Sequence, residues 1–314
     1  EQSYDAAIRA DSFPLNSFLP ADSLGIVDLT LQARGTGFDP LLPRTRTSLR
    51  AQIDRAEFGG RDFGGIELDA ELDSQRLSGR ISDRDEALRL LLSVSGTLTE
   101  REQRIGLSGS VFGFDLAALG VSPEPIGGSF ALDASASAAG KGAYAARIAL
   151  DSIEIRNKHR TDRIRPTSVS LHTDSAATRA EAASGDLSLT FSTPQSADSL
   201  IAALTRSART LAGQIDAQSI DMEQLKPALP DFALRVSAGP DNILNSLLKS
   251  RKIAFDALNA EGANCDSLPV SIRLRTEGLA YGNVVLDTVT ADIRQNGKRL
   301  EYALGLANVP GNLD

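Results

Sequence analysis

The residues that could carry out chemistry are few in this sequence, which has two histidines and one cysteine among 314 residues. His159 lies in the charged segment NKHRTDR, where we expect an exposed turn. His172, in VSLHTD, shares the strand parity of Ser170, and Asp174 two residues later could pair with it. No Gly-x-Ser-x-Gly elbow or other activated nucleophile accompanies either histidine, so a histidine-dependent active site is not predicted.

Metal, thiol and phosphate chemistry also lack the residues they need. One cysteine and two dispersed histidines give a zinc ion too few ligands. The acidic segment at 83–86 (DRDE) lacks the ligand spacing of a calcium loop and is interpreted as a solvated hairpin. Cys265 has no basic neighbour that would activate its thiol. The glycine pairs at 59–60, 64–65 and 127–128 fall at expected strand turns rather than in a phosphate-binding loop. We therefore expect no enzyme activity, no cofactor and no metal.

The composition excludes further classes of function. The net charge is −8 and no basic block stands out, so nucleic acid is not an expected partner. Apolar residues make up 41% of the chain, far above the disordered range, but aromatic residues only 5% and tryptophan is absent. So few aromatic side chains would fill a large compact core poorly, and the composition therefore favours a long, shallow β architecture.

The chain carries no expected membrane or export segment. No apolar run approaches the roughly 18 to 20 residues of a spanning helix. The first residues, EQSYDAAIRADSF, are polar and lack an initiator methionine, so we interpret the sequence as an internal fragment of a longer protein. A single cysteine suits an oxidising compartment, where stray thiols are a liability.

Alternation of apolar and polar residues dominates the chain and predicts strands of an antiparallel sheet with one apolar face. Two clear cases are 87–98 (ALRLLLSVSGTL) and 65–72 (GIELDAEL). Similar alternating runs are found at 27–33, 49–53, 130–136, 144–150, 168–173, 187–191, 232–236, 270–274 and 300–306.

Two segments have helical spacing instead. In 196–214 (SADSLIAALTRSARTLAGQ) the apolar residues recur at helical intervals, and Ser196 or Asp198 could serve as N-cap. In 241–252 (DNILNSLLKSRK) Asp241 is the expected cap, and the basic residues at the end complement the helix dipole. We expect two short amphipathic helices, neither of them a membrane anchor. The first could cap one end of a groove or cover a sheet edge.

A similar pattern occurs three times, starting at Phe13, Phe114 and Ile220, about 100 residues apart. Each copy begins with spaced apolar residues, meets proline, enters a strand and ends in glycine, as in FDLAALGVSPEPIGGSFALDASASAAG. We therefore predict one elongated β region over 1–314, built of approximate repeats at 13–113, 114–219 and 220–314.

These repeats resemble those of the AsmA-like, TamB-type proteins (translocation and assembly module subunit TamB) of Gram-negative envelopes. The resemblance is carried by the segment from Phe114 to Gly140, by ISDRDEALRLLLSVSGTL, and by SIEIRNKHRTDRIRPTSVSLHTDSAATRAEAASGDLSLTF followed by a helix. The last segment is similar to TamB-like proteins of Bacteroidota in particular.

The resemblance implies a periplasmic β structure that curls into a U-shaped groove with an apolar concave face. It also implies an inner-membrane helix at the N-terminus and an outer-membrane assembly partner. We expect the helix, and the region that contacts the partner, to lie outside this sequence. The implied role is phospholipid transport between membranes, outer-membrane protein assembly, or both. The expected ligands are phospholipid acyl chains or unfolded strands of outer-membrane proteins, and we expect a monomer.

The residues expected to line such a groove are the apolar members of the alternating strands. They are Ile66, Leu68, Leu72, Leu88, Leu90, Leu92, Val94, Val270, Ile272, Leu274, Tyr302 and Leu304. The sequence leaves a second interpretation open, because a closed β-sandwich array with a structural or adhesive role would bury the same residues in an ordinary core.

Overall fold

The computed structural model describes residues 3–14, 24–58, 61–140, 142–158, 160–216, 221–249, 252–265 and 268–307. Strands account for 66% of the chain and helices for 12%. The mostly β, antiparallel architecture predicted from the alternating pattern is therefore confirmed. Nine of the eleven runs named above lie wholly in strands, and the runs at 65–72 and 87–98 each begin one residue before their strand.

The strands form one 20-stranded antiparallel sheet in which the chain runs as a meander, so that successive long strands are hydrogen-bonded neighbours. The short strands β4, β11 and β16 each pair with one of the long strands and do not interrupt this order. The strands are β1 (Ser3–Pro14), β2 (Leu24–Thr36), β3 (Arg46–Phe58), β4 (Arg61–Phe63), β5 (Ile66–Asp73), β6 (Arg76–Arg84), β7 (Leu88–Leu98), β8 (Glu102–Asp115), β9 (Gly127–Ala139), β10 (Ala143–Arg156), β11 (Thr161–Ile164), β12 (Thr167–Thr173), β13 (Thr178–Ser184), β14 (Leu187–Thr193), β15 (Phe232–Ala238), β16 (Ile253–Ala254), β17 (Ala257–Cys265), β18 (Leu268–Tyr281), β19 (Val284–Asn296) and β20 (Arg299–Ala307).

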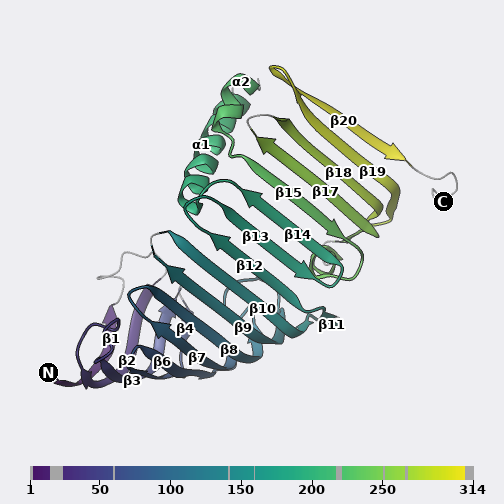
Figure 1. Cartoon of the computed structure of the whole chain (residues 1–314). Coiled ribbons are helices and arrows are strands. Elements are labelled where there is room, and N and C mark those ends of the chain that lie inside the picture. Colours follow the sequence, from purple (N-terminus) through teal and green to yellow (C-terminus); the bar gives the residue numbers. More distant parts are fainter. Residues whose placement is uncertain are drawn as a thin grey trace. The chain divides into compact units, whose positions relative to one another are not determined.

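The chain divides into two compact units, which are described separately below. The first comprises Glu1–Gly140 and Ile148–Ile164, and the second comprises Lys141–Arg147 and Arg165–Asp314. Within each unit the strands lie side by side in a single layer (Figure 1). The repeats at 13–113, 114–219 and 220–314 stay a prediction.

Tight hairpins explain why neighbouring strands pair in sequence order. Between β5 and β6, only Ser74 and Gln75 separate the paired residues Asp73 and Arg76, and both have positive φ (51° and 71°). Two successive left-handed residues make the type of turn whose twist matches that of the flanking strands. Between β19 and β20, Gly297 supplies a φ of 58° at no steric cost.

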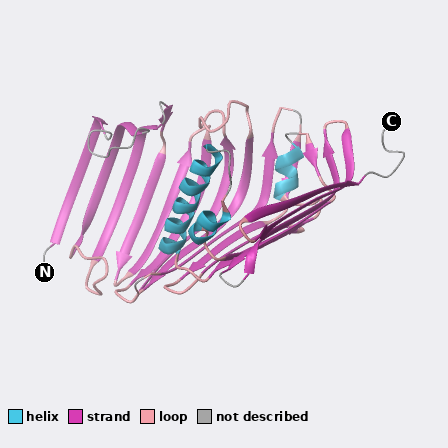
Figure 2. Cartoon of the chain, turned by 90° about the horizontal axis from the view of Figure 1, so that it is seen from above, coloured by secondary structure: helices cyan, strands magenta, loops and turns pink. Residues whose placement is uncertain are grey.

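The helices among the described residues belong to the second unit (Figure 2). Both predicted helices are confirmed, as α1 (Ala197–Asp216) and α3 (Ile243–Lys249). The one-turn helix α2 (Met222–Leu225) and the 3₁₀ turn η2 (Lys226–Ala228) were not predicted, because a single turn leaves no periodic signal in the sequence.

The buried core is small for the length of the chain. The chain exposes 20091 Å² of surface, whereas a compact protein of this mass would expose about 12,600 Å². Only a few apolar side chains are fully buried, among them Val27, Leu92, Val111 and Ile153. Most apolar side chains on the sheet are therefore covered by their lateral neighbours and not by a second layer.

Gly109 in β8 shows how closely these strands approach one another. Its φ is 152°, and a Cβ at this position would overlap the carbonyl oxygen of Leu91 and lie 2.9 Å from the Cα of Leu92. Only glycine combines this backbone conformation with so close a neighbour.

We expect Gly109→Ala to lower the free energy of unfolding of the first unit by at least about 1–3 kcal/mol, because the backbone must shift or store strain. Thermal or urea unfolding measures the effect. Gly106→Ala is the matched control in the same strand, since the nearest atom to its Cβ would be the hydroxyl oxygen of Ser95, at 3.2 Å, and the backbone oxygens of Ser95 and Ala134 would lie at ordinary contact distances of 3.8 and 3.9 Å. Equal stability of the two variants would show that the approach at Gly109 is not restrictive.

Candidate functional site

The strand register of the first unit gathers apolar side chains on one face. Directly opposite residues of antiparallel strands point to the same side, so each run of partners forms a row across the sheet. One row crosses eight strands, from β1 to β9, and its members are Ile8, Leu31, Ala51, Leu68, Ile81, Leu92, Gly109 and Leu132. We call this side of the first unit its apolar face.

The seven predicted lining residues of the first unit all lie on this apolar face. Leu92 is buried, with 7% of its surface exposed. Leu90 and Leu88 pair with Val111 and Phe114 of β8. The half-buried members of the predicted set are Ile66, Leu68, Leu72, Leu88, Leu90 and Val94.

The opposite face of the first unit is polar and carries cross-strand ion pairs. Arg50 contacts Asp69 at 2.7 Å, and Arg34 contacts Asp5 at 3.1 Å. The side chains in these pairs are more than half exposed, so each pair contributes little to stability, about 0–1 kcal/mol. Their main effect is to keep this face in water.

The second unit has an apolar face built in the same way. One of its rows contains Leu171, Ala180, Phe191, Leu234, Gly262, Ile272, Ile293 and Tyr302. The next contains Val169, Ala182, Leu189, Val236, Ala260, Leu274, Ala291 and Leu304. Both rows run from β12 to β20 without a charged residue.

Exposure differs strongly among the predicted lining residues of this unit. Tyr302 and Leu304 are 77% and 74% exposed, Ile272 is 41% exposed, and Leu274 is half-buried. Val270 is only 7% exposed, because Met222 and Leu225 of α2 pack on it. Four of the five residues therefore reach solvent, whereas Val270 belongs to a small core under α2.

Two surface hollows lie on the polar sides of the strands. The first, about 530 Å³, lies in the first unit among side chains that include Arg34, Arg50 and Glu71. The second, about 390 Å³, lies in the second unit beside Arg235 and Glu261. Neither hollow is lined by a residue predicted to line the groove, so the candidate site is an apolar surface and not one of these hollows.

The acidic segment at 83–86 differs from its predicted solvated state at one position. Asp83 is only 5% exposed and stands on the apolar face, opposite Leu90. Burial raises the pKa of its carboxyl group, while a hydrogen bond from the backbone N–H of Asp85 (2.8 Å) acts in the opposite direction. Asp83 thus holds the turn before β7, which explains why an acid occupies an apolar row.

The other candidate chemical residues have structural surroundings. His172 lies opposite Arg179 on the polar side of β12, as its parity predicted. Asp174 accepts hydrogen bonds from the backbone N–H groups of Ala176 and Ala177, which keep its pKa low and close the turn before β13. His159 lies outside the described residues. Cys265 is half-buried at the end of β17.

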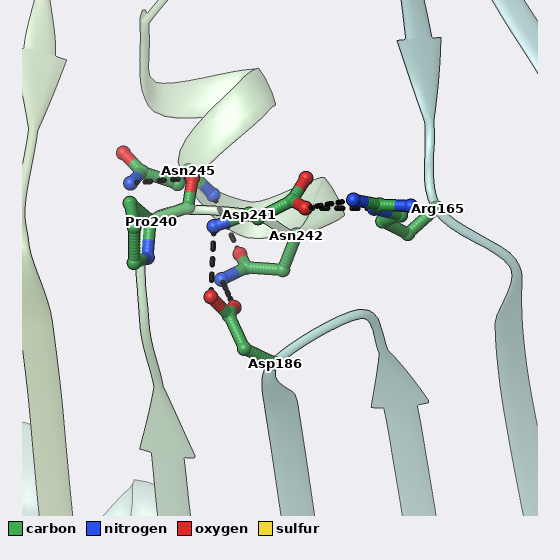
Figure 3. Close-up of polar contacts among 6 residues, drawn as sticks. All are labelled: Arg165, Asp186, Pro240, Asp241, Asn242 and Asn245. Atoms are coloured by element: carbon green, nitrogen blue, oxygen red, sulfur yellow. Dashed lines mark hydrogen bonds and ion pairs between the residues drawn. The ribbon is translucent and has the colours of Figure 1, made fainter.

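A cluster of polar residues secures α3 to the sheet, and it corrects the predicted cap. The side-chain oxygen of Asn242, not that of Asp241, accepts a hydrogen bond from the backbone N–H of Asn245 (2.9 Å) and so caps α3 (Figure 3). Asp241 instead pairs with Arg165 at 2.6 Å. Aspartate and asparagine are equally good caps, so residue type alone does not decide between Asp241 and Asn242.

Asp186 completes this cluster from the turn between β13 and β14. It accepts hydrogen bonds from the side chain of Asn242 (2.6 Å) and from the backbone N–H of Asp241 (2.9 Å) (Figure 3). Desolvation alone would raise the pKa of Asp186, but these and further backbone hydrogen bonds together outweigh it and lower the pKa below its ordinary value. The polar groups of this cluster bond to one another, so we interpret the cluster as a support of the fold and not as a binding site.

Comparisons with known proteins identify no relative. No protein-family model matches the chain, and searches of curated proteins and of solved structures give no significant match. The resemblance to TamB-type proteins therefore stays a prediction that depends on the quoted sequence segments.

The described residues hold no group of three or more histidine, cysteine or acidic side chains placed to bind a metal ion. In the same part of the chain, the helices are all too short or too polar to span a bilayer.

The lowered pKa of Asp186 predicts a pH dependence of stability. A carboxyl group with a depressed pKa in the folded state stabilises the fold above its unfolded pKa, and this contribution is lost as the pH falls through the folded pKa. Asp186→Asn, which removes the charge, should therefore lower the free energy of unfolding most near neutral pH. The difference in this free energy between variant and wild type should shrink as the pH falls from about 5 to about 2.

Urea unfolding of wild type and variant across this pH range measures the effect. Glu181→Gln, which removes an exposed acid on neighbouring β13, is the control for the change in net charge. A constant difference between Asp186→Asn and wild type at every pH would contradict the prediction.

Proposed function

We propose that this chain is a non-enzymatic periplasmic segment of a TamB-like envelope protein whose apolar sheet face binds acyl chains of phospholipids, or apolar strands of outer-membrane proteins in transit. The observation that carries the proposal is the uncharged pair of rows from β12 to β20, in which Ile272, Tyr302 and Leu304 are exposed. In the full-length protein, other regions would supply the inner-membrane anchor and the outer-membrane partner, so that the whole bridges the two membranes.

Burial of hydrocarbon is sufficient chemistry for this role. Each methylene group removed from water contributes about 0.8 kcal/mol, so an acyl chain gains affinity from any extended apolar surface without hydrogen bonds or charges. The ligand can also move along such a surface, because neighbouring positions bind it with similar free energy. The face accordingly needs no reactive residue.

The small residues on β13 and β17 favour a flexible apolar ligand. On the apolar face of the second unit, β13 presents Ala180 and Ala182, and β17 presents Ala260 and Gly262. An acyl chain can approach the backbone more closely over these strands than over the larger side chains between them, which increases its dispersion contacts. A chain of about 16 carbons is about 20 Å long and would cross roughly four strands at their usual spacing.

The exposed residues of β20 allow a test that leaves folding intact. We expect the double variant Tyr302→Asp/Leu304→Asp to remain folded, because both side chains are exposed, and to lose at least about tenfold in phospholipid binding, because two charges enter the apolar rows. By contrast, Leu92→Asp should unfold the first unit, since a charge at this buried position costs several kcal/mol.

Native mass spectrometry of delipidated protein after incubation with phospholipid vesicles measures the bound lipid. The matched control is Ala307→Asp, which adds a charge to the same strand opposite Thr288 on the other face. Wild-type protein that binds no phospholipid would remove the lipid form of the proposal. The protein-cargo form is then tested with a synthetic amphipathic β-strand peptide, and failure of both ligands would overturn the proposal.

A further inference from the structure

The first strand of the sheet has one free edge. In the described part of the chain, β2 is the strand that pairs with β1 (Figure 1). Every second residue of β1 therefore directs its backbone N–H and C=O groups away from β2, to a side that the described strands leave open. The pairing with β2 is regular from Ser3 to Ala10, and its register shifts only beyond Ala10. A row of unpaired backbone groups is a template for an extended polypeptide strand.

The charges of β1 are placed symmetrically and have opposite signs. Asp5 and Arg9 lie on the polar face, each two residues from Ala7. In an antiparallel pair of two copies centred on Ala7, Asp5 of each copy lies directly opposite Arg9 of the other, because both are equally distant from the centre. Residues of the same parity also meet, so the free backbone groups of one copy face those of the other. This arrangement creates two cross-strand ion pairs and no directly opposed like charges.

The ion pairs within one copy leave these groups accessible and extend the pattern. Asp5 contacts Arg34 of β2 at 3.1 Å, and Arg9 contacts Asp11 at 3.1 Å. The side chains in both pairs are more than two-thirds exposed. In the paired copies Asp5 lies between Arg34 and the Arg9 of the second copy, so the sign of the charge alternates across the contact. The two identical edges are therefore complementary in charge.

The same register matches the apolar face of the first unit. Ile8, which is 52% exposed at the free edge, comes opposite Ala6, and Tyr4 comes opposite Ala10. Each large side chain thus faces a small one and neither pair is crowded. Tyr4 is turned towards β3, where its hydroxyl group hydrogen-bonds to Thr47 Oγ1 (2.7 Å). The apolar rows of the two copies join, and Ile8 is removed from water.

Other registers and the other end strand lack this complementarity. A shift of two residues removes both ion pairs, and in one direction it places Asp5 opposite Asp11. A shift of four residues places Asp5 or Arg9 opposite the same residue of the second copy. The end strand β20 carries both of its charges, Arg299 and Glu301, near its start. Antiparallel pairing about the centre of β20 therefore forms no ion pair, and the observations favour β1.

We propose that two copies of this chain form a two-fold dimer by antiparallel pairing of β1 with β1, centred on Ala7, in which Asp5 of each copy binds Arg9 of the other. Each copy uses the same edge, so assembly stops at two. The proposal departs from the monomer expected from the resemblance. It does not rest on the proposed function, because it needs no lipid and concerns the first unit, whereas the exposed rows that carry the proposed function belong to the second unit.

Sedimentation velocity of the 314-residue chain over a range of concentrations tests the proposal. Wild type should form dimers. Asp5→Arg and Arg9→Asp should each raise the dissociation constant of the dimer by at least about tenfold, because each variant replaces two attractive pairs by two repulsive ones. The double variant Asp5→Arg/Arg9→Asp restores opposite signs across the two-fold axis and should return the constant to within about threefold of wild type.

Disulfide cross-linking locates the contact. In a Cys265→Ser background, Ala7→Cys should give a covalent dimer on mild oxidation. The two side chains at the two-fold centre are direct neighbours, at a Cα separation of about 5.5 Å that a disulfide accepts. Ala303→Cys is the matched control, at an exposed alanine in the middle of the other end strand, and should give no covalent dimer.

Wild type that remains monomeric up to about 1 mM would overturn the proposal. A dimer that the double variant does not restore would also overturn it, as would a covalent dimer from Ala303→Cys and none from Ala7→Cys. Assemblies larger than two copies would contradict it, because β1 of one copy would then pair with a different strand of the next. Phospholipid binding by Asp5→Arg should equal that of wild type, so the dimer and the proposed function fail independently.

Discussion

The two-residue period of the β-strand is the constraint on which this structure depends. Because paired residues of antiparallel strands share a face, one consistent register collects every second side chain on the same side across many strands. Leu92, for example, is buried in a row in which its direct partners are Ile81 and Gly109. A shift of one residue in any strand would bring charges such as Arg50 or Asp69 into the apolar rows, so the register is strongly specified.

A single-layer sheet with this register has more apolar surface than it can cover by itself. Part of the second unit solves the problem locally, where α2 places Met222 and Leu225 over Val270. Elsewhere the rows end in exposed residues such as Leu304, and α1 adds a further exposed apolar surface. The proposed function follows from this excess, since the exposed apolar rows of the sheet are covered when an apolar ligand binds to them.

The sequence predicted what depends on periodicity and missed what depends on contacts between distant segments. Alternation identified eleven of the twenty described strands and the face of residues such as Leu90 and Ile272, and 3.6-residue spacing identified α1. The burial of Asp83 and of Val270 could not be predicted, because it depends on a turn and on a one-turn helix that no period marks. The capping role of Asn242 depends on Asp186, 56 residues away, which no local pattern can reveal.

The meander connectivity gives the fold an additive character. Each strand exchanges its backbone hydrogen bonds almost entirely with the preceding and following strands, as β6 does with β5 and β7. The free energy of such an array is close to a sum of nearest-neighbour terms, and folding can begin at any hairpin and extend in both directions. Evolution can therefore lengthen or shorten a protein of this kind by whole hairpins, adjusting the distance it covers while leaving the remaining strands undisturbed.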